Sequence, residues 1–214
     1  VHVNLIQPWC DKIAKESGDK LKCQIYPAMQ LGGTPAQLFE QARDGVADIV
    51  WTIPTYSAGR FVKSEVFELP FFTRSAKGSS QAYWTFVHKH ALDEYKGVRP
   101  LWLHTNDGSS FHMTRASGVK SLDELKGLKI RSTPNPYHIQ AFKLLGMNPA
   151  PMPISELYTA LETGTFDAQE HPINVTWSSK FYEVQKHLTV SNHIYSPLVV
   201  AMNKAKFDSL PANY

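Results

Sequence analysis

The chain has 214 residues, of which 43% are hydrophobic, so it is long enough for one large domain or two small ones with real cores. Its formal net charge of +3 is spread without long runs of one sign, and this does not indicate the clustered basic surface of a nucleic-acid-binding protein. No stretch approaches the roughly 18 consecutive apolar residues that a membrane-spanning helix requires.

The first half of the chain predicts helices and strands in alternation. Apolar residues at helical spacing over 5–13 indicate a first helix that ends at Gly18. Residues 34–37 (TPAQ) form a capping box with proline at the first helical position. The elements expected before the polar linker 105–110 are a helix over 5–17, a strand over 21–26, a helix over 35–44, a strand over 48–51, a long helix over 75–96 and a strand over 98–104.

Residues 126–172 predict three short apolar strands separated by two helices. The first helix begins at Pro136 and stops at Gly146, and the second has Ser155 as its N-cap and stops at Gly164. Strand, helix, strand, helix, strand in so short a span is typical of a parallel sheet in an α/β protein. After it we expect a short helix around 174–177, a strand over 188–190 and a strand over 194–202.

Two polar residues lie where this predicted sheet would bind a ligand. In parallel sheets, ligands bind at the C-terminal ends of the strands. Arg131 follows one predicted strand and His171 follows another. These two residues are therefore the first candidates for a binding site.

An internal repeat suggests two similarly built domains. LFEQARDGVAD over 38–48 matches LYTALETGTFD over 157–167, with Leu, an aromatic residue, Gly and Asp at the same offsets. Chance similarity between two helix–strand units is the alternative. Chain crossings near Asn106 and Asn192 would then form a two-strand hinge. The expected lobes are lobe I, residues 1–106 plus 193–214, and lobe II, residues 107–192.

The chain has two cysteines, one in the first predicted helix and one just beyond it. If Cys10 and Cys23 are bonded, closing the short loop between them contributes roughly 3 kcal/mol to stability. Two buried free thiols are the alternative, and the sequence leaves the choice open. No CxxC spacing indicates a metal or redox site.

Enzyme motifs are missing from the sequence. It contains no GxSxG, HExxH, P-loop or GxGxxG pattern, and we expect neither a catalytic residue nor a cofactor nor a metal. His88 and His90 are two residues apart on a predicted helix and do not share a face, so they do not form a metal site. An α/β hydrolase or lyase acting on a small carboxylate stays open as the second hypothesis.

The order of motifs along the whole chain resembles the solute-binding proteins of tripartite ATP-independent periplasmic (TRAP) transporters, of the C4-dicarboxylate-binding-protein type. The motifs that carry this resemblance are IYPAMQLGG, FEQARDGVADI, FELPFF, SLDELKGLKIR, LGMNPAPMPISELYTALETGTFDAQEHP, FYEVQKHLTVSNHIYSP and FDSLP. The resemblance implies a two-lobed α/β periplasmic binding protein of type II-like architecture, with a mixed sheet in each lobe and a ligand cleft between the lobes. It also implies that the chain is part of a longer protein whose signal and C-terminal helical segment are not included.

The ligand residues of the family carry over one by one. The signature arginine at the end of KGLKIR is Arg131, whose guanidinium can grip a carboxylate with two parallel charge-assisted hydrogen bonds. Where the family often has asparagine in its QENP loop this chain has His171, which makes the contact pH-sensitive. Where several members have an additional arginine this chain has Phe111, and where the sialic-acid-binding members have an acidic residue it has Ile53. Phe111 argues against a second cationic clamp, and Ile53 argues against a large polyhydroxylated sugar acid as the ligand.

Aromatic and amide side chains complete the expected site. They fall on loops or strand ends near the expected cleft, although any one aromatic residue is more often part of a core. The set consists of Trp51, Phe71, Phe111, Tyr137, Trp177 and Tyr195, with Asn135 and Asn174 as hydrogen-bonding groups for a hydroxyl or carbonyl. These residues predict a compact monocarboxylate, either a hydroxy or keto acid or an aromatic acid.

The resemblance also implies partners and a location. The expected protein is a periplasmic monomer that closes on a small organic acid and hands it to the membrane permease subunits of a TRAP transporter. A binding protein of an ATP-driven or tricarboxylate importer is a third hypothesis, which the KGLKIR and QEHP pairing disfavours. A metal-bridged ligand, as in some relatives, is left open.

Overall fold

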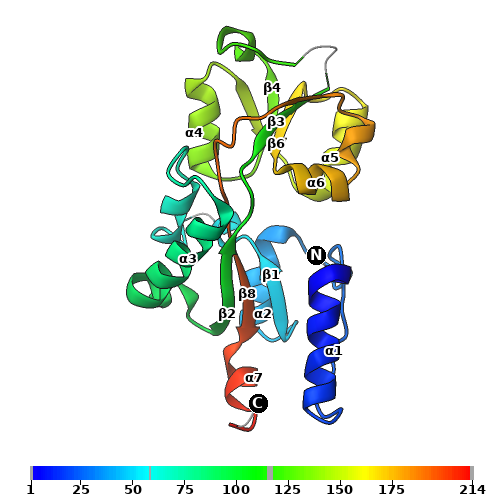
Figure 1. The fold of residues 1–214 in the computed structure, drawn as a ribbon, viewed down its shortest axis with the longest axis vertical. Coiled ribbons are helices and arrows are strands. Elements are labelled where there is room, and N and C mark those ends of the chain that lie inside the picture. The colour runs from blue at the N-terminus through cyan, green and yellow to red at the C-terminus, as the bar shows by residue number, and fades with distance from the viewer. Residues whose placement is uncertain (1, 58, 115–117, 213–214) are drawn as a thin grey trace.

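The computed structural model describes residues 2–57, 59–114 and 118–212, and it divides the strands between two sheets. The first sheet contains β1 (Ile49–Thr52), β2 (Val98–Thr105) and β8 (Pro197–Asn203) in the order β1-β8-β2, all antiparallel. The helices packed around it are α1 (Gln7–Glu16), α2 (Leu38–Arg43), α3 (Ala76–Phe86) and α7 (Lys204–Asp208). Figure 1 shows this sheet in the lower half of the molecule.

The second sheet has five strands in the order β5-β4-β6-β3-β7. As predicted, β4 (Lys129–Ser132) pairs in parallel with β5 (Asn148–Pro151) and β6 (Ala168–His171). β3 (Ser110–Met113) pairs antiparallel with β6 and with β7 (His187–Thr189), so the sheet is mixed. α4 (Pro136–Leu144) covers one face, and α5 (Ile154–Glu162) and α6 (Ile173–Ser178) cover the other (Figure 1).

The chain crosses between the two sheets twice, and the crossings lie side by side (Figure 1). The backbone N–H of Asn106 donates to the carbonyl of Ser196 at 3.0 Å, and the N–H of Ser196 donates to Asn106 Oδ1 at 2.7 Å. A Cβ on Gly108 would lie 2.7 Å from Oδ1 of Asn192, so glycine lets the crossings approach closely. We propose the lobes defined above, with boundaries at 106/107 and 192/193.

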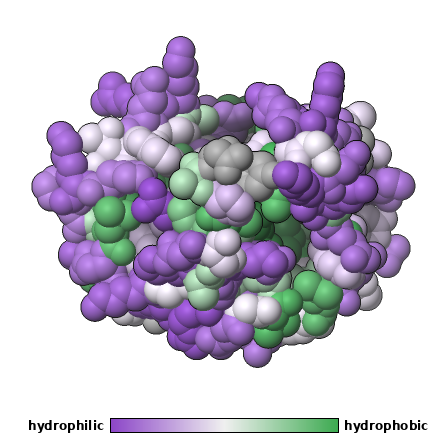
Figure 2. Space-filling view, turned by 90° about the horizontal axis from the view of Figure 1, so that it is seen from below, coloured by the Kyte–Doolittle hydropathy of each residue, from purple (hydrophilic) through white to green (hydrophobic). Residues whose placement is uncertain are grey.

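Each sheet has its own core. The core of the first sheet is rich in aromatic residues, with Phe39, Phe61, Tyr83 and Tyr95 all buried and in ring contact with a neighbour in it. The two faces of the second sheet carry separate clusters, one under α4 and one under α5. Seen from below, the outer surface is largely hydrophilic, with hydrophobic residues in the middle of the face and in smaller groups toward its edges (Figure 2). Among the described residues, no helix has the length and apolar character needed to traverse a bilayer.

The predicted strand over 21–26 is wrong. This segment is irregular and pairs with no strand of either sheet within the described residues. Its alternation does not bury one face, because only Leu21 and Ile25 are partly covered. A disulfide between Cys10 and Cys23 holds it against α1, which settles the choice that the sequence left open.

Two helix boundaries also differ from the predictions. The α-helix expected over 75–96 ends at Phe86 and continues as a π-helical turn over 87–91 and a 3₁₀ turn over 92–95. Lys63 Nζ donates a hydrogen bond to the His90 carbonyl at 2.8 Å, which stabilises the π-helical turn. The N-cap of α5 is Pro153 rather than Ser155, because the proline, with φ −57°, sets the entry of the chain into the helix.

Candidate ligand-binding site

A cavity of about 200 Å³ lies where the two lobes meet. Lobe I contributes a loop ahead of α2 and the turn after β1, and lobe II contributes the ends of β4 and β5. The lining residues are Thr34, Pro35, Ala36 and Tyr56 from lobe I, and Arg131, Pro134, Pro151, Met152, Pro153 and Ile154 from lobe II. Most of this wall is apolar, and its one cationic side chain is that of Arg131.

Arg131 is the cation of the cavity and is 1% exposed. Its Nε and Nη2 donate to the Met152 carbonyl at 2.8 and 2.6 Å, which fixes the plane of the guanidinium. Tyr56 from lobe I also hydrogen bonds to the guanidinium. Burial lowers the pKa of Arg131, and Tyr56 and Glu170 oppose this shift. Guanidinium groups stay protonated in proteins, so the cavity has a fixed positive charge with a remaining edge for hydrogen bonding.

His171 lies against this guanidinium, with its Nε2 at 3.4 Å from Arg131 Nη1. Its Nδ1 contacts Gln169 Oε1, and Gln169 Nε2 donates to Gln185 Oε1 at 2.8 Å. Burial, followed by the charge of Arg131, holds the pKa of His171 well below its usual value. A neutral His171 with its Nδ1–H on Gln169 accepts at Nε2 from Arg131. The lowered pKa moves any protonation of His171, and with it the pH sensitivity expected at this position, to a lower pH than is usual for histidine.

Asn135 joins the two lobes. It is the N-cap of α4, and its Oδ1 accepts from the backbone N–H of Tyr137 at 2.8 Å. Its Nδ2 donates to Glu68 Oε2 of lobe I. Both ends of the amide are thus engaged by protein groups, and Asn135 is 2% exposed.

Three of the predicted aromatic residues are at least partly buried. Trp51 is half-buried and donates from Nε1 to His104 Nε2 at 3.0 Å. Phe111 belongs to the core under α4 and stacks on His193 with ring centroids 4.4 Å apart. Tyr195 is 6% exposed. None of the three lines the 200 Å³ cavity.

The other predicted residues lie on exposed surfaces. Phe71 and Trp177 are each 71% exposed, and Trp177 stacks on Tyr182 at 4.9 Å. Asn174 is exposed on α6, and Tyr137 is 39% exposed on the first turn of α4. Of the predicted site residues, Arg131 alone lines the cavity. His171 lies behind it against the guanidinium, Asn135 is buried at the start of α4, and the predicted aromatic residues are outside the cavity wall.

Sequence reasoning missed a buried cluster beside Arg131. His138 of α4 lies between two carboxylates, with Nε2 at 3.7 Å from Glu68 Oε1 and Nδ1 at 3.8 Å from Glu170 Oε1. Burial raises the pKa of Glu68 to about 7 and raises that of Glu170, while burial lowers that of His138. The available signal was an acidic residue inside an apolar run, FELPFF for Glu68. Within residues 2–57, 59–114 and 118–212, no group of three or more acidic, histidine or cysteine side chains is placed to hold a metal ion.

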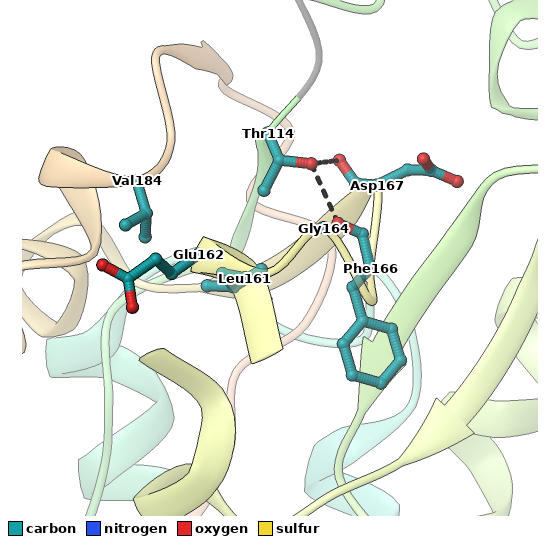
Figure 3. A pocket seen from close by; sticks show the side chains of 7 residues that line it. All are labelled: Thr114, Leu161, Glu162, Gly164, Phe166, Asp167 and Val184. Carbon is teal, nitrogen blue, oxygen red and sulfur yellow. Dashed lines mark hydrogen bonds between the residues drawn. The ribbon is translucent and has the colours of Figure 1, made fainter. Parts of the chain in front are cut away.

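A second hollow, of about 310 Å³, lies on lobe II (Figure 3). Its two ionisable side chains, Glu162 and Asp167, are both acidic. The Thr114 hydroxyl already donates hydrogen bonds to the carbonyls of Phe166 and Asp167, at 2.9 and 2.8 Å. An organic anion would meet negative charge and no cation here, so this hollow is not a candidate for the anion site.

Comparison with known proteins identifies the relatives of this chain. Residues 1–214 match the family described as bacterial extracellular solute-binding protein, family 7. The chain is 40% identical over 209 residues to the 2,3-diketo-L-gulonate-binding periplasmic protein of Escherichia coli (strain K12), covering 95% of this chain and 62% of the relative. It therefore spans about three fifths of the length of this curated relative.

Solved structures show the same fold. A TRAP solute-binding protein from Rhodoferax ferrireducens T118, in complex with copurified benzoate, superposes with a TM-score of 0.92 at 40% identity, covering 98% of this chain and 66% of that one. A marine-metagenome TRAP solute-binding protein specific for aromatic acid ligands, in complex with 3-hydroxybenzoate, has a TM-score of 0.91 at 36% identity, covering 99% of this chain and 67% of that one. These matches confirm the two-lobed α/β fold predicted from the sequence.

Proposed function

Because the chain belongs to family 7 of the bacterial extracellular solute-binding proteins, the type that serves TRAP transporters, we propose that it binds a compact monocarboxylate between its lobes, with Arg131 as the carboxylate anchor. The family and its named relatives are receptors rather than enzymes, which sets the hydrolase or lyase hypothesis aside.

One observation carries this proposal: a single buried guanidinium stands in a mainly apolar cavity. The Met152 carbonyl holds Arg131 in place along its Nε–Nη2 side. The remaining Nη1–Nη2 edge suits a carboxylate, which takes two parallel charge-assisted hydrogen bonds from an arginine. A ligand bound there would place its carboxylate on Arg131 and its remaining atoms against the apolar wall.

The cavity wall favours an aromatic acid over a sugar acid. The cavity volume of about 200 Å³ is below the ~300–1,000 Å³ of sites for drug-sized ligands. Prolines at 35, 134, 151 and 153 and the side chain of Ile154 offer no hydrogen-bonding side chains to a polyhydroxylated ligand. Hydroxyl groups buried against such a wall would lose hydrogen bonds to water without replacement. A benzoate-type ring would instead gain from apolar burial.

Membership of an extracellular solute-binding family supports a role outside the cytoplasm. We propose that the chain acts in the periplasm and delivers its ligand to the membrane permease subunits of a TRAP transporter. Lobe closure around the ligand would use the paired crossings near Asn106 as the hinge, because opening there would separate Tyr56 of lobe I from Arg131 of lobe II. A monomeric receptor is sufficient, because residues of one chain form the whole cavity.

A ligand panel tests the proposal. Thermal shift followed by calorimetry would compare benzoate, 3-hydroxybenzoate, succinate and L-gulonate at equal concentration. The proposal predicts the largest stabilisation by the two aromatic monocarboxylates. Stabilisation by succinate or L-gulonate alone would refute the assignment of ligand class and leave the family intact.

A further inference from the structure

Glu68 lies at the contact between the lobes, next to the cavity. We propose that Glu68 takes up a proton from solvent when the lobes close on an anion, so that carboxylate binding is coupled to proton uptake. This inference rests on the proposed function, because the anion concerned is the carboxylate held by Arg131.

The geometry places Glu68 in a sealed polar cluster. Its side chain is 1% exposed and comes from the 3₁₀ segment Ser64–Glu68 of lobe I. Oε2 accepts from Nδ2 of Asn135, the N-cap of α4 in lobe II, and Oε1 lies 3.7 Å from Nε2 of His138 on that helix. Among the described residues, that His138 nitrogen has no hydrogen-bond partner. Separating the lobes would expose Glu68 to water, so its environment depends on closure.

The charges in this cluster do not balance once an anion enters. Glu68 and Glu170 supply two carboxylates, and Arg131 supplies one positive charge. A ligand carboxylate on Arg131 would make three anions around one cation in a water-poor site. Protonating one carboxylate is the least costly way to remove the excess negative charge.

The negative charges of Glu68 and Glu170 extend to the cavity wall, where they affect the pKa of Tyr56. Tyr56 lines the cavity and hydrogen bonds to Arg131. Burial raises the pKa of Tyr56, and the negative charges of Glu68 and Glu170 raise it further, while Arg131 opposes them. A ligand carboxylate at this wall is repelled by the same two negative charges. The interaction is mutual, so a bound carboxylate in turn favours protonation of Glu68 or Glu170.

Glu68 is the group suited to hold the proton. Burial raises its pKa to about 7, and the nearby Glu65 charge adds to this, whereas hydrogen bonds from Thr55, Ser196 and Asn135 act in the opposite direction. Burial also raises the pKa of Glu170, but electrostatic interactions with His138 and Arg131 oppose that shift together with a hydrogen bond from Ser109, whereas hydrogen bonds alone oppose the shift of Glu68.

The buried imidazoles next to the cluster do not take this proton near neutral pH. Burial lowers the pKa of His138, and the charge of Arg131 lowers it further, although Glu170 opposes the shift. Burial, with His138 nearby, lowers the pKa of His193 to about 4. His171 stays neutral beside Arg131. The carboxyl group at the lobe contact therefore remains as the acceptor.

Calorimetry in two buffers of different ionisation enthalpy measures the proton directly. The probe is benzoate or, if benzoate does not bind, the carboxylate of the panel above that gives the largest thermal shift. We expect uptake of about half a proton per bound anion at pH 7, rising toward one at pH 6, and a Kd about tenfold weaker at pH 8 than at pH 6. The Glu68→Gln variant should show no uptake and a flat Kd over this range.

Glu65→Gln is the matched control, because Glu65 is buried on the same 3₁₀ segment but accepts from the Gly59 N–H. It should keep proton uptake on binding, with the midpoint at a lower pH than in the wild-type protein because the Glu65 charge that helps raise the pKa of Glu68 is gone. Tight binding without proton uptake in the wild-type protein would overturn the inference and leave the proposed function standing. Failure of every carboxylate to bind would overturn both. If Glu68→Gln does not fold, the wild-type proton count and pH profile decide alone.

Discussion

Replacing Arg131 with alanine is the most informative change at the site. It removes two hydrogen bonds to the Met152 carbonyl, the contact with Tyr56 and the positive charge beside Glu170. Truncating one partner of a buried charge pair costs about 2–5 kcal/mol, since the other charge remains buried and unpaired. Because each ~1.4 kcal/mol corresponds to a factor of ten, the Kd for benzoate should rise by about 30-fold to 4,000-fold.

Isothermal titration calorimetry with benzoate would measure this loss. Arg131→Lys should recover part of the affinity, because it keeps the charge but not the planar two-donor geometry. Lys129→Ala is the matched control, since Lys129 lies on the same strand with its side chain exposed. Chemical denaturation checks that each variant is folded at the titration temperature. A Kd for folded Arg131→Ala within about threefold of wild type would refute the role of Arg131.

Three further changes test other parts of the structure. Replacing Cys10 and Cys23 together by serine should lower the free energy of unfolding by roughly 3 kcal/mol in urea titrations, and a loss below about 1 kcal/mol would contradict a stabilising disulfide. Glu68 has its pKa raised in the folded state, so its stabilising contribution is complete below the unfolded value of 4.5 and is lost as pH rises through about 7. Measured with saturating benzoate, which keeps the lobes closed over Glu68, Glu68→Gln should therefore gain about 2 kcal/mol of unfolding free energy relative to wild type between pH 5 and pH 8, and a constant difference would show that Glu68 does not titrate there. Tyr56→Phe should weaken benzoate binding by about 1 kcal/mol through the lost hydrogen bond to Arg131, and an unchanged Kd would show that this hydrogen bond does not support the anchor.

Elements with strong local signals were predictable from sequence. The repeat units at 38–48 and 157–167 both form a helix and a glycine stop and lead directly into a strand, with Gly45 at φ +78° and Gly164 at φ +71°. Local backbone preference dictates these features, so the residues alone identify them. The strand expected over 21–26 failed because alternation predicts a strand only where a neighbouring strand and a core are present.

The site was predictable only within one lobe. Arg131 and His171 lie at the C-terminal ends of the neighbouring parallel strands β4 and β6. Such ends lie at the same edge of a parallel sheet, so the predicted sheet places the two residues close together. Glu68 and Tyr56 come from lobe I, and their contacts with Arg131 and Asn135 depend on how the lobes pack. Phe111 could not be assigned to core or site from the sequence, because all four residues of β3 are buried and an aromatic residue in such a strand does not reveal which face it joins.

The contact between Arg131 and the ligand carboxylate is the centre of this account. A crystal structure of the protein with benzoate would test it most directly. We predict both carboxylate oxygens within hydrogen-bonding distance of the Arg131 guanidinium, with the ring between Pro35 of lobe I and the Pro151–Ile154 segment of lobe II. Benzoate in the hollow of Figure 3, or in the cavity with its carboxylate away from Arg131, would contradict the account.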